Sequence, residues 1–101
     1  MPKCKITVLK RMAHQDLADE YCEPGAALPC PRFADGQEFL VRFDDLPDES
    51  FCDWAWNDIY KSVVTLMNRG SYPQAKDKNT LIACCGDGIR PVVFKLERIA
   101  D

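Results

Sequence analysis

Apolar and polar residues alternate with a period of two in several parts of the chain, and this pattern predicts strands. Residues 5–12 place Ile6 and Val8 on one face, and residues 32–43 and 90–99 contain two further alternating segments. Residues 80–85 contain a continuous apolar run, which predicts a strand in the centre of a sheet. Asp87-Gly88 separates the last two strands, so we expect a hairpin closed by a type I′ turn.

The longest helical pattern covers residues 50–70, and the rest of the fold is expected to be organised around it. Ser50 and Asp53 resemble a capping box at its start, and Arg69-Gly70 is the expected end. A wide apolar sector predicts a helix that is covered on more than one side. The main apolar stripe consists of Phe51, Ala55, Ile59, Val63 and Leu66. A second, short helix is expected at residues 16–22, with Asp16 as its N-cap.

The predicted element order is therefore β-α-β-α-β-β, which indicates an α+β fold in a single domain over residues 1–101. We expect a mainly antiparallel sheet of about four strands with the one long helix packed on a face. The hydrophobic fraction of 47% is sufficient for one core of this size.

The net charge of −3, with scattered basic residues, argues against a nucleic-acid partner. No apolar run reaches the ~20 residues that a membrane-spanning helix requires, so no membrane partner is expected. The first residues lack the apolar segment of a secretory signal, which predicts a cytoplasmic protein. In that reducing compartment the six cysteines are expected to be free thiols, metal ligands or redox groups.

Four of these cysteines are the candidate site residues. Cys84 and Cys85 end the predicted third strand, but neighbouring strand residues point to opposite faces, so one of them is expected to be a core residue. Cys52 lies in the first turn of the long helix, whose N-terminal half-charge favours a thiolate and whose Asp53 opposes it. Cys30 lies on a rigid loop between two prolines.

Two kinds of chemistry remain open for these thiols. One is a soft metal ion bound by thiolates, although the chain lacks the CxxC pairs of most thiolate sites. The other is redox chemistry. If neither applies, all of the cysteines have a structural role. His14, the single histidine, has no ligand-like neighbour in the sequence and is expected to be a surface or cap residue. The acidic residues at 44–53 lack the spacing of a calcium loop.

Trp54 and Trp56 are two residues apart on the predicted helix and therefore point in different directions. One is expected to enter the core, and the other to line a groove or an oligomer contact. This predicts an alternative function, a non-catalytic protein–protein interaction domain that is a homodimer.

Three strings resemble a family of small proteins of about this length, found mainly in anaerobic bacteria and archaea, with no assigned activity. They are Cys30-Pro31 with Gly36-Gln37-Glu38-Phe39, the FCDWAWNDIY string at 51–60, and the CCGDGIRPVVFK string at 84–95. The family pattern often has Thr at the position of Gly86, a departure that affects the turn rather than the thiols. The resemblance implies that the cysteine-bearing segments define the group, and it implies nothing about a substrate.

Overall fold

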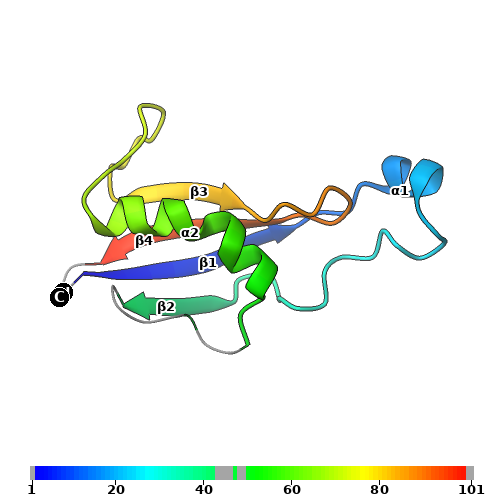
Figure 1. The fold of residues 1–101 in the computed structure, drawn as a ribbon, viewed down its shortest axis with the longest axis horizontal. Helices are drawn as coiled ribbons and strands as arrows, with labels where there is room; N and C mark the ends of the chain where they lie inside the picture. The colour runs from blue at the N-terminus through cyan, green and yellow to red at the C-terminus, as the bar shows by residue number, and fades with distance from the viewer. Residues whose placement is uncertain (1, 43–46, 48–49, 100–101) are drawn as a thin grey trace.

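The computed structural model describes residues 2–42, 47 and 50–99 of the chain. Phe43, at the end of the second alternating segment, and residues 44–46 and 48–49 of the acidic segment lie outside the described residues. The element order is the predicted one, and the chain forms an α+β fold with two helices (Figure 1). The elements are β1 (Lys3–Arg11), α1 (Gln15–Tyr21), β2 (Glu38–Arg42), α2 (Asp53–Met67), β3 (Thr80–Cys84) and β4 (Val92–Ile99).

The four strands form one sheet in the order β2-β1-β4-β3, and every neighbouring pair is antiparallel. Its register aligns apolar residues across all four strands. Ile6 of β1 lies opposite Phe39 of β2 and Leu96 of β4, and Leu96 lies opposite Leu81 of β3. All four side chains are buried, because α2 packs on β1, β4 and β3 of this face and the rings of Phe33 and Phe51 pack against Phe39 (Figure 1).

The prediction that the third strand is central was wrong, because β3 is an edge strand and β1 and β4 are the central ones. Within β3 only Leu81 is buried, whereas Ile82 and Cys84 are exposed on the face that α2 does not cover. A continuous apolar run is typical of a strand that is covered on both faces. Here the run instead reflects one buried face and apolar side chains left on the open face.

The long helix starts later than the sequence predicted. Cys52 is the N-cap of α2, with extended backbone angles (φ −71°, ψ 126°), and its own side chain makes no capping hydrogen bond. The capping box of Ser50 and Asp53 was therefore wrong, because the chain is still extended at Cys52 and Asp53 is the first helical residue. The predicted stripe from Phe51 to Leu66 is confirmed as the buried face.

Coverage of α2 on more than one side was also wrong. Trp54, Tyr60 and Val64 are exposed, so the sheet covers a single face of the helix. The two tryptophans separate as predicted: Trp56 packs edge-on against Phe51 and Tyr60, whereas the Trp54 side chain is 79% exposed.

The end of α2 is a Schellman motif. The Gly70 N–H donates to the Thr65 carbonyl at 2.8 Å, and the Arg69 N–H donates to the Leu66 carbonyl at 3.1 Å. Arg69, rather than glycine, occupies the left-handed position with φ 66°. Gly70 is needed for a different reason: a Cβ there would lie 2.9 Å from the Thr65 carbonyl oxygen.

Four phenylalanine rings join the segments that will form the site. Phe33 lies 5.1 Å from Phe51 and 5.2 Å from Phe94, and Phe39 lies 4.8 Å from Phe51, measured between ring centroids. Most of these pairs are edge-to-face, the favourable geometry for aromatic rings. The loop before β2, the start of α2 and strand β4 are thereby held together in the core.

The short helix α1 lies away from the sheet, beyond the end of β1 (Figure 1). It begins after His14, so the predicted Asp16 cap was wrong. Only Ala18 of this helix is buried, and its two large apolar side chains, Leu17 and Tyr21, are exposed. In the part of the chain that the structure describes, no helix has the length and apolar character that a membrane crossing requires.

Candidate functional site

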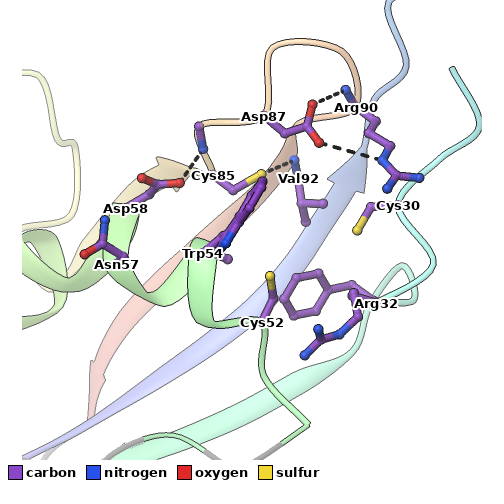
Figure 2. Close-up of a pocket in the computed structure, with 13 residues that line it drawn as sticks. Cys30, Arg32, Cys52, Trp54, Asn57, Asp58, Cys85, Asp87, Arg90 and Val92 are labelled. Atoms are coloured by element: carbon purple, nitrogen blue, oxygen red, sulfur yellow. Dashed lines mark hydrogen bonds and ion pairs between the residues drawn. The ribbon is translucent and has the colours of Figure 1, made fainter. Parts of the chain in front are cut away.

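Three of the six cysteines line one cavity of about 510 Å³. Cys30 comes from the loop before β2, Cys52 from the N-cap of α2 and Cys85 from the residue after β3. Figure 2 shows their sulfurs around the same space, beside Trp54 and Val92. All three residues are half-buried and packed against the hydrophobic core. The fold thus brings together thiols that are separated by 22 and 33 positions in the sequence.

Cys84, the fourth predicted site residue, does not line this cavity. It points to the open face of the sheet, because successive residues of a strand point to opposite sides. Partial burial raises the pKa of the Cys84 thiol, and the charges of Cys85 and Asp58 act in the same direction. The pair is therefore divided, with Cys85 at the cavity and Cys84 outside it.

Backbone hydrogen bonds hold Cys85 in position. Its N–H donates to the Val92 carbonyl at 3.1 Å, and the Val92 N–H donates to the Cys85 Sγ at 3.3 Å. The first bond continues the pairing of β3 with β4 for one residue past the end of β3, and the second ties the side-chain sulfur to β4. The sulfur is therefore oriented by the sheet itself and not by a flexible loop.

Cys52 and Cys30 are held in different ways. The Cys52 carbonyl accepts the first hydrogen bond of α2, from the Trp56 N–H at 2.9 Å, and its side chain makes no capping hydrogen bond. The Cys30 carbonyl accepts a hydrogen bond from Arg11 Nη1 at 3.2 Å. In both residues the backbone is fixed while the thiol faces the cavity (Figure 2).

The turn between β3 and β4 supplies part of the cavity wall. The predicted hairpin is present, since β3 and β4 are antiparallel neighbours, but the predicted type I′ turn is wrong. Among the described residues, neither Asp87 nor Gly88 has a positive φ. Instead the Asp87 Oδ1 accepts the N–H groups of Ile89 at 2.9 Å and Arg90 at 3.0 Å, which gives a longer, side-chain-braced turn.

Four charged side chains line the cavity with the thiols, and sequence reasoning selected none of them. Asp87 and Arg90 form a pair, with 3.7 Å between Asp87 Oδ2 and Arg90 Nε. The hydrogen bond from the Arg90 N–H, together with the Ile89 N–H and the Arg90 charge, lowers the pKa of the Asp87 carboxyl. Asp58 and Arg32 are the other two.

Asp58 connects α2 with the turn. Its Oδ2 accepts the Gly86 N–H at 2.6 Å, and a Cβ on Gly86 would lie 3.0 Å from the same oxygen. Glycine at position 86 therefore permits this close approach. The sequence offered one indication of Asp58: it lies in the FCDWAWNDIY string, on the polar side of the helix.

Arg32 is exposed at the other side of the cavity, and its Nη2 donates to the Phe51 carbonyl at 3.4 Å. It therefore contacts the residue that precedes Cys52 and links the Cys30 loop to the start of α2.

Cys4 differs from the three cavity thiols. It faces the core from β1, has no exposed surface, and burial raises its pKa to about 12. This cysteine is a small core residue. His14 also lies outside the cavity lining, and its N–H donates to the Ile89 carbonyl at 2.7 Å.

The thiols do not form a ready-made metal site. Over residues 2–42, 47 and 50–99, no group of three or more His, Cys, Asp or Glu side chains is arranged to hold a metal ion. Cys84 is turned away from Cys85, and Cys30 and Cys52 lie on separate segments of the cavity wall. The predicted soft-metal site of Cys30, Cys52, Cys84 and Cys85 thus gains no geometric support.

Comparisons of the chain with protein-family models, with curated proteins and with solved structures find no match.

Proposed function

We propose that this protein is a small thiol-based redox module that works in the reducing cytoplasm, with Cys52 and Cys85 as the working thiols and Cys30 as the next candidate. The observation that supports this is the meeting of three thiols from distant segments at one cavity. A cysteine used only as a small core residue is buried as Cys4 is, whereas these three are partly exposed.

The reaction proposed is thiol–disulfide exchange with a small disulfide. A cavity cysteine loses its proton to solvent and attacks one sulfur of the disulfide, forming a bond between the protein and that half. The disulfide bond of the ligand breaks, and the other half leaves as a thiolate that takes up a proton. The protein thiol is thereby oxidised to a mixed disulfide while half of the ligand is reduced.

The test is the rate at which each thiol reacts with an aromatic disulfide reagent under anaerobic conditions, with peptide mapping to identify the modified residue. We expect Cys52 or Cys85 to react faster than a cysteine in an unstructured peptide. Changing the faster residue to serine should abolish the fast phase. Cys84→Ser is the matched control, because Cys84 adjoins Cys85 in sequence but lies outside the cavity, and it should leave the fast phase unchanged.

Two results would contradict the proposal. The first is that the cavity thiols react no faster than the peptide cysteine. The second comes from metal analysis of protein purified anaerobically: one or more equivalents of metal bound by the thiols would replace the redox function by metal binding.

The second candidate is a protein–protein interaction domain that works as a homodimer. Its support is the exposure of large apolar side chains: Trp54 is 79% exposed, Tyr21 is 75% exposed, and Leu28 is also exposed. Light scattering over a range of concentrations tests this. We expect the dimer to weaken in Trp54→Ala, and a strictly monomeric protein at high concentration would exclude this function.

A further inference from the structure

We propose that the cavity selects a small disulfide of the amino-acid type, which carries both a carboxylate and an ammonium group; the disulfide of cysteine is the simplest example. This inference rests on the proposed function, because it names the substrate class of the same thiols. The charges, the size and the walls of the cavity support it.

The charges that line the cavity balance. Two guanidinium groups, of Arg32 and Arg90, face two carboxylates, of Asp58 and Asp87. Asp87 is already paired with Arg90 across 3.7 Å, so this pair neutralises itself. A ligand with a large net charge of either sign therefore gains little electrostatic attraction from this lining. A ligand that carries one positive and one negative group, and no net charge, is complementary to it.

The remaining two charges lie at opposite ends. Figure 2 shows Asp58 on one side of the cavity and Arg32 on the other, with the sulfurs of Cys52 and Cys85 between them. Asp58 is held by the Gly86 N–H, and Arg32 is held by the Phe51 carbonyl. The ammonium group of one half at Asp58 and the carboxylate of the other half at Arg32 would place the disulfide bond between them, near the two thiols. Arginine is well suited to a carboxylate because its planar fork donates two parallel hydrogen bonds.

The size and the walls of the cavity fit the same class. The volume of about 510 Å³ lies within the range of small-molecule sites. Phe33, Ala55 and Val92 supply apolar walls for the carbon atoms and sulfurs, and the exposed Trp54 indole forms a side of the opening. A short aliphatic chain with polar ends would bury its middle and leave its charged groups at the rim.

The reaction in this site is thiol–disulfide exchange. One sulfur of the amino-acid disulfide bonds to the sulfur of Cys52 or Cys85, and one molecule of the free amino-acid thiol leaves.

The experiment uses the wild-type protein and compares three disulfides in which two carbons follow each sulfur and which differ only in the charged groups that they carry. These are cystine, cystamine, which lacks the carboxylates, and 3,3′-dithiodipropionate, which lacks the ammonium groups. Intact mass spectrometry gives the rate of mixed-disulfide formation, and each rate is divided by that of N-acetylcysteine with the same reagent. We expect the normalised rate for cystine to exceed each of the others by about threefold, the effect of a partly exposed charge pair, and to lose this advantage at high salt.

Two variants locate the charges. Asp58→Asn keeps an oxygen that can accept the Gly86 N–H, and it should lower the rates with cystine and cystamine while leaving the dithiodipropionate rate unchanged or higher. Arg32→Gln should lower the rates with cystine and dithiodipropionate. Asp19→Asn and Arg42→Gln are matched controls, because these exposed residues lie outside the cavity, and they should change none of the ratios.

The outcomes separate this inference from the proposed function. Fast cavity thiols that show equal normalised rates with all three reagents, or a preference for the cationic or anionic one, would overturn the inference and leave the redox function intact. Thiols that are no faster than N-acetylcysteine with any reagent would overturn both. The wild-type comparison needs no variant, so the inference stays testable even if Asp58→Asn fails to fold.

Discussion

Replacing Phe51 tests whether the aromatic cluster holds the site together. Phe51 directly precedes Cys52, is almost completely buried, and its ring contacts four other aromatic rings. The ring centroids of Phe39 and Phe33 lie 4.8 and 5.1 Å away, and those of Phe94 and Trp56 lie 5.6 and 6.2 Å away. Phe51 therefore joins the rings of the sheet and of the loop before β2 to Trp56 at the start of α2.

The expected magnitude follows from these contacts. Truncation of a buried phenylalanine to alanine costs about 3–5 kcal/mol, through lost burial and the cavity that remains. Phe51→Leu retains most of the apolar volume but loses the ring pairs, each of which contributes about 0.5–1.5 kcal/mol. Because these pairs share one ring and do not add fully, we expect Phe51→Leu to cost about 1–3 kcal/mol.

Urea denaturation followed by circular dichroism measures both losses as a change in the free energy of unfolding. The matched control is Tyr21→Ala, an aromatic truncation at a 75% exposed position, which should change stability by less than about 0.5 kcal/mol. If Phe51→Ala costs less than about 1 kcal/mol, the ring cluster does not hold the start of α2, and the argument for a fixed Cys52 fails with it.

Three further changes test other parts of the structure. Arg69→Gly should raise the free energy of unfolding by about 0.5–1 kcal/mol in urea denaturation, because glycine removes the left-handed strain at φ 66°, and no gain would contradict the Schellman assignment. Asp87→Asn should lower stability at pH 7, and this loss should shrink as acid titrations pass below the ordinary carboxyl pKa of 3.8. The reason is that folding lowers the pKa of the Asp87 carboxyl. The stabilisation by this carboxylate is therefore fully present above the unfolded-state pKa and is lost as the pH falls through the folded-state pKa. An equal loss of stability in Asp87→Asn at pH 7 and at pH 2 would contradict this explanation. Cys4 should resist iodoacetamide at pH 8 in the folded protein and react in denaturant, as followed by peptide mapping, since it is buried with a pKa of about 12.

The periodicity of the sequence was sufficient for the elements and for the face that each buries. Ile6 and Val8, Phe39 and Val41, and Val92, Phe94 and Leu96 all lie on the buried side, as their spacing predicted. This works because burial of one face depends on local geometry, with a period of two in strands and 3.6 in helices. Three local predictions were wrong: the helix caps at Ser50 and Asp16 and the type I′ turn at Asp87-Gly88. Each depended on a short sequence pattern that is compatible with more than one local structure.

The candidate site was predictable only in part. Cys30, Cys52 and Cys85 were selected by residue type. The alternation of strand residues correctly predicted that the side chains of Cys84 and Cys85 would point to opposite faces. Arg32, Asp58, Asp87 and Arg90 were not selected, because a charged residue on a polar helix face or in a turn is most often a solvated one.

What the sequence determined by itself was therefore the α+β class, the element order, the core faces and the list of thiols. What only the tertiary structure decided was the strand order, with β3 at the edge, and which thiols share a cavity. The physical reason is that the strand order and the cavity depend on contacts between segments far apart in the chain, such as Asp58 with Gly86 and Phe33 with Phe94. A local sequence pattern does not predict such contacts, because they form only when the helix packs on the sheet.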